Sequence, residues 1–112
     1  VYYIYCIEIN PTEIGWSRDE FVQALNAEGV MARRGYHTPL HKTELFKNIN
    51  KPDINYLSKL IKYPDYDKLH LKTADRLSKR MVWLPIFPRI TQEEIEIVVR
   101  AIKKLIAWKK RK

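Results

Sequence analysis

The C-terminal stretch of this 112-residue chain restricts its fold more than any other segment. Thr91-Gln-Glu-Glu94 has the pattern of a capping box, in which a threonine and a glutamate satisfy free amides at a helix start. Behind it, apolar residues recur at helical spacing on one stripe about 100° wide: Ile95, Val98, Val99, Ile102, Leu105 and Ile106. A helix with a single apolar stripe needs a second layer to cover, so we expect a layered globular domain.

Three short runs are predicted to form the sheet of that domain. Residues 1–9 are rich in β-branched and aromatic side chains and end at Asn10-Pro11. Their continuous apolarity predicts a strand buried on both faces, or covered by a partner on one, with Cys6 buried in the middle. Residues 30–32 and 81–85 are the second and third predicted strands, and residues 10–16 are a turn.

A second capping box, Ser17-Arg-Asp-Glu20, predicts a helix over about 18–28 that stops at Gly29. Residues 72–80 are predicted as another helix, with Ala74 and Leu77 facing inward. Between them the pattern weakens: residues 42–52 are polar with scattered apolar anchors. Asp53 is expected to cap a short helix that ends at Tyr63-Pro64 and carries Ile54, Leu57, Leu60 and Ile61 at helical spacing.

These elements predict an α+β fold. We expect a two-layer α/β sandwich with a small, three- to four-stranded, largely antiparallel sheet and helices on one face. The length fits a single domain over residues 1–112.

The net charge of +8 is concentrated at one end of the chain. Residues 100–112 hold seven basic groups and no acidic one, which leaves a net charge of +1 over residues 1–99. Cations at a helix C-terminus complement the helix dipole, and this is the interpretation we favour. The alternative is a small basic regulatory or nucleic-acid-interaction module that uses this Lys/Arg helix, although a nucleic-acid footprint more often spreads over a face.

Composition also limits the setting in which the chain works. No apolar run reaches the length of about 20 residues that a membrane helix needs, so no membrane partner is expected. A single cysteine fits a reducing cytoplasm. The abundance of Ile, Lys and Glu, with only two Gln, resembles a thermophile's composition. The chain starts without methionine in a strand-like run, from which we expect that a preceding segment is missing.

One loop gathers most of the groups that could carry chemistry. Around Gly35 and Pro39, two residues that break regular structure, lie Arg33, Arg34, Tyr36, His37 and His41. Arginines with tyrosine and histidine donors suit an anionic ligand such as a phosphate, a carboxylate or a nucleotide diphosphate. For the arginines, solvated charges at a strand end are the alternative.

Catalytic and metal patterns are weaker. His37 and His41 are four residues apart, but Pro39 lies between them, and a zinc site needs three or four convergent ligands. We therefore predict no metal site, and find no self-sufficient set of catalytic residues. The chain has no glycine-rich phosphate loop and no G-x-S-x-G motif.

Several short stretches, in this order and spacing, resemble the C-terminal small domain of the DegT/DnrJ/StrS family of PLP-dependent sugar aminotransferases. They are Tyr2-Tyr3-x-Tyr5-x-Ile7, Arg18-Asp19-Glu20-Phe21-x-x-x-Leu25, Glu28-Gly29-Val30, Tyr36-His37-x-Pro39-Leu40-His41, Ala74-Asp75-Arg76-Leu77-x-x-Arg80, Leu84-Pro85-x-x-Pro88 and Thr91-x-Glu93-Glu94. The resemblance covers essentially the whole chain. Residues 47–70 depart from it, since the segment is longer and more basic than the loop expected there.

The resemblance implies a fold-type I small domain and a chemistry that this chain cannot carry out alone. Such enzymes are homodimers. They move an amino group from glutamate or glutamine, by way of pyridoxal phosphate, to a nucleotide-linked keto-sugar used in polysaccharide biosynthesis. The Schiff-base lysine lies in a large domain that precedes the small one and is absent here. The chain is then expected to bind no cofactor by itself. Its expected partners are the missing large domain or a dimer partner, and Arg33, Arg34, Tyr36, His37 and His41 line one wall of a substrate cleft.

Overall fold

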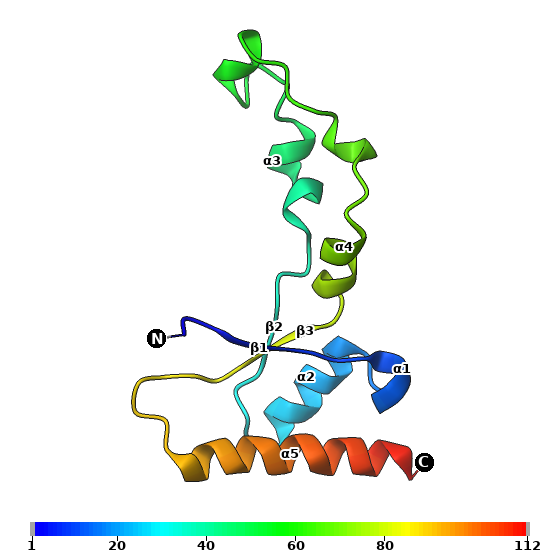
Figure 1. The fold of residues 1–112 in the computed structure, drawn as a ribbon, viewed down its shortest axis with the longest axis vertical. Coiled ribbons are helices and arrows are strands. Elements are labelled where there is room, and N and C mark those ends of the chain that lie inside the picture. The colour runs from blue at the N-terminus through cyan, green and yellow to red at the C-terminus, as the bar shows by residue number, and fades with distance from the viewer. Residues whose placement is uncertain (1, 112) are drawn as a thin grey trace. The chain divides into compact units, whose positions relative to one another are not determined.

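A computed structural model describes residues 2–111 of the chain, which divide into two compact units (Figure 1). Unit 1 combines both ends of the sequence, Val1–Gly35 and Lys79–Lys112, and unit 2 is the intervening segment Tyr36–Ser78. All three strands of the sheet lie in unit 1, whereas unit 2 contains only short helices.

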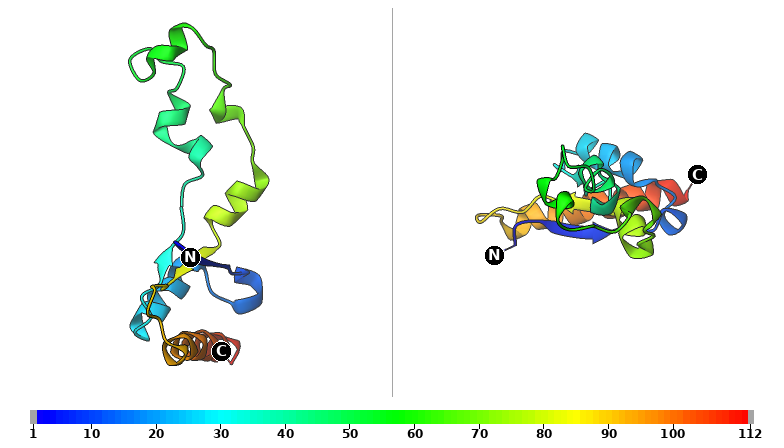
Figure 2. Two further views of the ribbon diagram at one scale, coloured as in Figure 1. Left: turned by 60° about the vertical axis from the view of Figure 1, so that its left-hand side comes forward. Right: turned by 90° about the horizontal axis from the view of Figure 1, so that it is seen from above.

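Unit 1 is built on a three-stranded antiparallel sheet in the order β1-β3-β2. The strands are β1 (Tyr5–Glu8), β2 (Arg33–Arg34) and β3 (Met81–Leu84), so the strand latest in the sequence is the central one. The helices α2 (Arg18–Ala27) and α5 (Gln92–Lys110) lie on the same side of this sheet (Figure 2). This confirms the predicted α+β class and the small antiparallel sheet.

Both predicted capping boxes are present. At α2 the Ser17 hydroxyl accepts from the Glu20 amide, and the Glu20 carboxylate accepts from the Ser17 hydroxyl at 2.7 Å and from its amide at 3.0 Å. These donated hydrogen bonds favour the ionised carboxylate and hold the pKa of Glu20 below its ordinary value. Thr91 and Glu94 form the same arrangement at α5. The other end of α2 is closed at Gly29, which has a φ of 84°, as expected for a left-handed stop.

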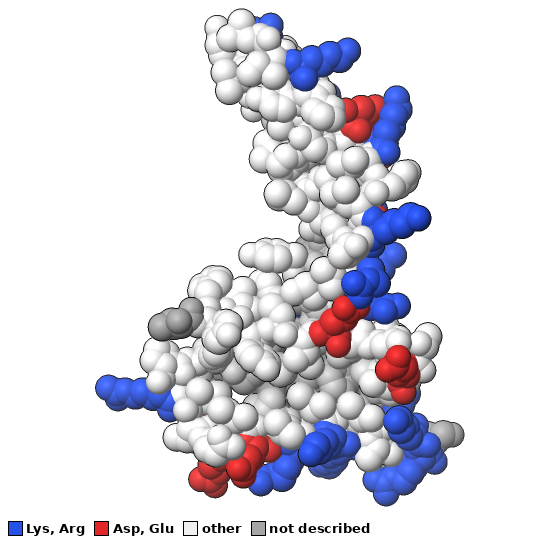
Figure 3. All heavy atoms as spheres, in the orientation of Figure 1, with Lys and Arg blue, Asp and Glu red and all other residues white. Residues whose placement is uncertain are grey.

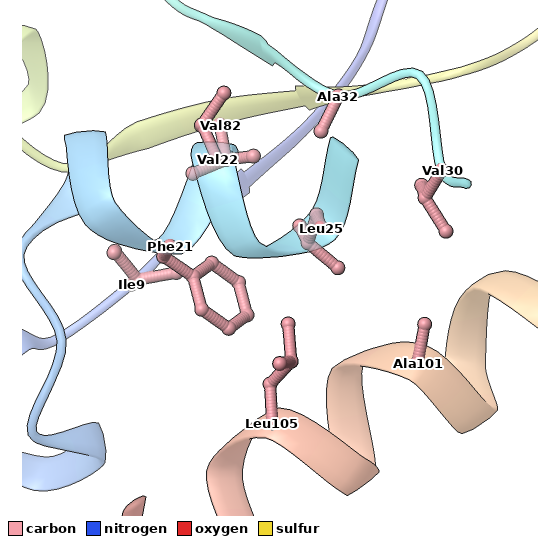
Figure 4. Packing of buried hydrophobic residues seen from close by; sticks show 9 residues of the cluster. All are labelled: Ile9, Phe21, Val22, Leu25, Val30, Ala32, Val82, Ala101 and Leu105. Atoms are coloured by element: carbon pink, nitrogen blue, oxygen red, sulfur yellow. The ribbon is translucent and has the colours of Figure 1, made fainter. Parts of the chain in front are cut away.

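The core of unit 1 lies between the sheet, α2 and α5 (Figure 4). Three side chains at its centre, Phe21, Leu25 and Val82, are fully buried. Ala101 and Leu105 of α5 close it from below α2, and Trp16 donates from its indole to the Leu105 carbonyl at 3.2 Å. Of the predicted stripe on α5, however, Ile95 and Val99 are each 41% exposed. The core therefore buries Leu105 of the stripe and partly covers Val98, Ile102 and Ile106.

Unit 2 is held by polar and aromatic links rather than by a buried apolar core. It contains η1 (Leu40–Lys42), α3 (Glu44–Lys47), η2 (Tyr56–Lys59), η3 (Tyr66–Lys68) and α4 (Lys72–Ser78). Lys42 and Asp75 form an ion pair at 2.6 Å, Phe46 meets Tyr66 edge to face at 5.1 Å, and Asn50 bonds the backbone of Tyr63 twice. Only His41 and Ser78 are buried among its residues.

The structure corrects three predictions in unit 1. The first strand is shorter than predicted: β1 is Tyr5–Glu8, and residue 1 of the predicted range lies outside the described residues. Cys6 is exposed, because it pairs with Trp83 on the face of the sheet turned away from the core, while Ile7 pairs with the buried Val82. The predicted turn at residues 10–16 contains the short helix α1 (Pro11–Ile14).

The second strand also lies later than predicted. The Val30 amide still bonds the Leu25 carbonyl at 3.0 Å, and Asn26 donates to the Ala32 carbonyl at 3.1 Å. Residues 30–32 are thus tied to the end of α2, and the chain reaches the sheet edge only at Arg33.

In unit 2, the helix expected behind Asp53 is wrong in both cap and extent. Asn55, not Asp53, caps η2 by accepting from the Leu57 amide, and η2 covers only Tyr56–Lys59. The helix predicted over 72–80 is confirmed as α4. Among residues 2–111, no helix is both long and apolar enough to cross a bilayer.

Candidate functional site

Two of the five predicted site residues, Arg33 and Arg34, form β2 at the edge of the sheet. Successive side chains of a strand point to opposite faces, and the register pairs Arg33 with Trp83 and Arg34 with Val82. Arg34 lies on the α2 side, with its guanidinium 3.7 Å from the Asp19 carboxylate, which also pairs with Arg18 at 2.6 Å. Arg33 lies on the open face and has no ion pair with any of residues 2–111.

Arg33 contributes the charge of a groove on that open face. The groove has a volume of about 310 Å³, and its aromatic walls come from Tyr3, Trp83 and Phe87. Met31 and Pro85 add apolar surface. A guanidinium beside aromatic rings can bind a planar or anionic group by stacking and by charge.

The aromatic residues of this groove, Tyr3, Trp83 and Phe87, are not among the site residues predicted from the sequence. One signal was available. Successive side chains of a strand point to opposite faces, and Val82 is the β-branched residue of the strand 81–84. If Val82 faces the core, Trp83 must lie on the opposite face.

The other three predicted residues, Tyr36, His37 and His41, belong to unit 2. Tyr36 is 72% exposed, and His37 is exposed with its Nδ1 3.4 Å from the Thr38 hydroxyl. His41 is different: it lies in η1 with only 5% of its surface exposed, and its Nε2 has no hydrogen-bond partner among the described residues. Leaving a ring nitrogen of histidine buried without a partner is costly, which sets His41 apart from the exposed His37.

The structure therefore sorts the five residues into two sets, Arg33 and Arg34 in unit 1 and Tyr36, His37 and His41 in unit 2. The two histidines differ in burial, one exposed and one enclosed. Within residues 2–111, no three His, Cys, Asp or Glu side chains are grouped as a metal site requires.

Comparison with known protein families gives a match over most of the chain. Residues 1–103 match the profile of the DegT/DnrJ/EryC1/StrS aminotransferase family. The chain belongs to this family. A search of curated proteins found no significant match. Membership makes the chain part of a DegT-type aminotransferase, a class of transferases that in general depends on pyridoxal phosphate.

The lysines of this family member do not fit the cofactor. A Schiff-base lysine needs an enclosed site in which its amine can lose a proton. Of the lysines in residues 2–111, all are exposed except Lys109, which is half-buried with its ammonium 4.5 Å from the centre of the Trp16 ring. None lines the groove that holds Arg33. The described residues therefore offer no site for the aldehyde of pyridoxal phosphate.

Several basic residues near the C-terminal end of α5 contact other residues of the fold. Lys104 pairs with Glu28 at 2.7 Å, Lys109 covers Trp16, and Arg111 donates to the Ala107 carbonyl at 3.3 Å. Trp16 also stacks on Trp108 with ring centres 5.6 Å apart. The last basic residue, Lys112, lies outside the described residues. These basic side chains thus form contacts within the fold, and none of the contacts favours nucleic-acid binding.

Proposed function

We propose that this chain is the C-terminal small-domain part of a PLP-dependent aminotransferase that acts on nucleotide-linked keto-sugars, with glutamate or glutamine as the amino donor. The observation that carries the proposal is the family match over residues 1–103. The ordered motifs from Tyr2 to Glu94 support the small-domain assignment, and the α+β unit with its antiparallel sheet is compatible with it.

In this proposal the chain supplies substrate-binding side chains from each of its two units and no proton-transfer group. Arg33 and Arg34 bind negative charge, because a guanidinium presents paired donors that match phosphate oxygens. Tyr36 and His37, both exposed, donate hydrogen bonds that orient the substrate. His41 is enclosed, so in this proposal it contacts the substrate less directly than Tyr36 and His37 do. Arg33 contributes more than Arg34, since Arg34 already has a carboxylate at 3.7 Å.

The catalytic lysine belongs to a large domain elsewhere in the enzyme, and a dimer partner completes the assembly. This chain is therefore inactive alone. The exposed or ring-covered lysines described above support that part of the proposal. The single cysteine fits an enzyme of the reducing cytoplasm, where sugar nucleotides for polysaccharides are made.

Two measurements on the purified chain test the proposal. Incubation with pyridoxal phosphate and glutamate should yield no 2-oxoglutarate above a protein-free control, and turnover would contradict it. Titration with pyrophosphate, the group common to nucleotide diphosphate sugars, should shift the NMR signals of Arg33 and of His37. The Arg33→Gln variant should reduce the Arg33 shift, while Arg34→Gln serves as the matched control with a smaller effect. No shift at any of the five residues would overturn their assignment as substrate contacts.

A further inference from the structure

The groove on the open face of the sheet contains aromatic surface that the substrate contacts proposed above do not use. Among the described residues that line it, Tyr3, Trp83 and Phe87 are aromatic and Arg33 is the only charged one. All four belong to unit 1. Small-molecule sites are typically lined by apolar and aromatic side chains, with a few polar groups that fix the orientation of the ligand. The groove has this composition.

The sheet holds Arg33 and Trp83 next to each other. They are direct partners in the register of β2 with β3. In an antiparallel pair, such side chains lie on the same face with their Cβ atoms about 4.5–5.5 Å apart. The indole nitrogen also packs closely on Gly35, since a Cβ added there would lie only 3.1 Å from the Trp83 Nε1. A guanidinium and a ring that are carried by strands are positioned more precisely than groups on loops.

The single charge determines which ring-containing ligands suit the groove. Aromatic rings alone also attract cations, which bind over the face of the ring. Here a cation would meet the guanidinium of Arg33, and no acidic residue is among the described residues that line the groove. The guanidinium has no ion pair with any of residues 2–111, so it can pair with an anion from a ligand. The groove therefore favours a planar ring that is joined to an anionic group.

The volume of the groove limits how much of a ligand it encloses. At about 310 Å³, the groove is at the lower end of the range of roughly 300–1,000 Å³ for small-molecule sites. It is therefore suited to one ring and the anionic group nearest to it, and not to a complete nucleotide-linked sugar. The sugar of such a ligand would extend out of the groove, beyond the phosphate.

We infer that this groove binds the base of the nucleotide, stacked among Tyr3, Trp83 and Phe87, while Arg33 pairs with the phosphate nearest to that base. The inference rests on the proposed function, which supplies a nucleotide as the carrier of the sugar. It adds a site for the base, which none of the five predicted site residues provides. Stacking on aromatic side chains tolerates different bases, because every base has a π-face. Uridine 5′-monophosphate (UMP) is therefore a suitable probe.

NMR titration of the 15N-labelled chain with UMP tests the inference, because the three tryptophans act as reporters in two places. Trp83 lines the groove. Trp16 and Trp108 stack on each other near Lys109, at the C-terminal end of α5, where Figure 3 shows basic atoms gathered. UMP should shift the indole N–H signal of Trp83 and leave the other two indole signals in place. Equal shifts of all three would indicate nonspecific attraction of phosphate to the basic helix end, and would overturn the inference.

Three further probes separate the ring from the anion. Ribose 5-phosphate lacks the base, and should shift the signals of Arg33 but not the Trp83 indole. Uridine lacks the phosphate, and should bind roughly tenfold more weakly than UMP because a charge-assisted hydrogen bond is lost. Benzoate joins a ring to an anion without a ribose between them. If benzoate binds more tightly than UMP, the groove is a site for aromatic carboxylates and the assignment to a nucleotide is wrong.

Two adjacent tyrosines provide matched variants, since both lie outside the strands and helices. Tyr3→Ser removes a ring of the groove, and should weaken UMP binding roughly fivefold or more, the scale of base stacking on an aromatic side chain. It should leave ribose 5-phosphate binding unchanged. Tyr2→Ser is the control, because Tyr2 is 74% exposed but does not line this groove. Equal affinity of the two variants for UMP would contradict the stacking.

The result at Trp83 also separates this inference from the proposed function. If pyrophosphate shifts the signals of Arg33 and His37 but UMP leaves the Trp83 indole unmoved up to about 10 mM, the groove holds no base and the inference is wrong. The phosphate contacts of the proposed function would then still stand. If UMP moves the Trp83 indole while pyrophosphate moves none of the five predicted residues, the groove binds a base and the phosphate contacts fail.

Discussion

Gly35 provides the sharpest test of how unit 1 is packed. It is buried beside β3, and its φ is not positive, so what it supplies is close approach rather than a special backbone angle. A Cβ at this position would lie 2.8 Å from the Met81 Cβ, 3.1 Å from the Trp83 Nε1 and 3.2 Å from the Met81 carbonyl oxygen. The Met81 Cβ and carbonyl belong to the central strand and cannot move without shifting it.

Gly35→Ala should therefore destabilise unit 1 as an overpacked site. Forced insertion of one methyl group into a packed site costs about 1–3 kcal/mol. A loss of about 2 kcal/mol corresponds to a fall in Tm of roughly 10 °C in a domain of this size. All three tryptophans lie in unit 1, so urea unfolding followed by tryptophan fluorescence reports on this unit.

Gly29→Ala is the matched control for that measurement. Gly29 has a φ of 84° and nothing within 4 Å of an added Cβ, so its substitution adds backbone strain of about 1 kcal/mol but no clash. We expect Gly35→Ala to lower the urea midpoint more than Gly29→Ala does. The slope of the unfolding free energy against urea concentration should not change. An unchanged midpoint for Gly35→Ala would refute the close packing of residue 35 against β3.

Two further predictions concern one polar link in each unit. The pKa of Glu20 is lowered in the folded state. Its negative charge therefore stabilises unit 1 fully at a pH above the ordinary pKa of a glutamate. This contribution is lost as the pH falls through the lowered pKa. The difference in stability between wild type and Glu20→Gln should thus be present at neutral pH and shrink in acid. In unit 2, Asn50→Ala removes both bonds to Tyr63, and limited proteolysis within residues 48–66 should accelerate.

Each of these predictions has an internal control. For Glu20, chemical denaturation at a series of pH values should show the difference only on the neutral side, and a difference that grows in acid would contradict the sign. For Asn50, the control is Asn48→Ala, because among the described residues the side chain of Asn48 bonds only Glu44, within one helical turn. Equal cleavage of the two variants, or a shifted unfolding midpoint of unit 1, would count against the role given to Asn50.

The features that depend only on residues close together in the sequence could be predicted from the sequence. Both capping boxes and the stop at Gly29 are local hydrogen-bond patterns, and the structure confirms them. The position of β2 could not be predicted in this way. It depends on Val30 and Ala32 remaining bonded to the end of α2, and this displaces the strand to Arg33. The exposure of Cys6 likewise follows from its register against Trp83, which no run of apolar letters reveals.

The candidate site was predictable in composition but not in arrangement. The gathering of Arg33, Arg34 and the residues after them is visible in the sequence. That the two arginines point to opposite faces requires the pairing of β2 with β3. The burial of His41 had no signal either, because residues 36–43 around it lack the periodic apolar pattern from which burial is usually inferred.

We propose that no lysine of this member of the DegT/DnrJ/EryC1/StrS aminotransferase family forms the imine with the cofactor. Borohydride reduction after incubation with pyridoxal phosphate, followed by peptide mass mapping, tests it most directly, since reduction fixes any imine to its lysine. We predict low, scattered labelling over the exposed lysines and no preferred position. Stoichiometric labelling of a single lysine would contradict this proposal.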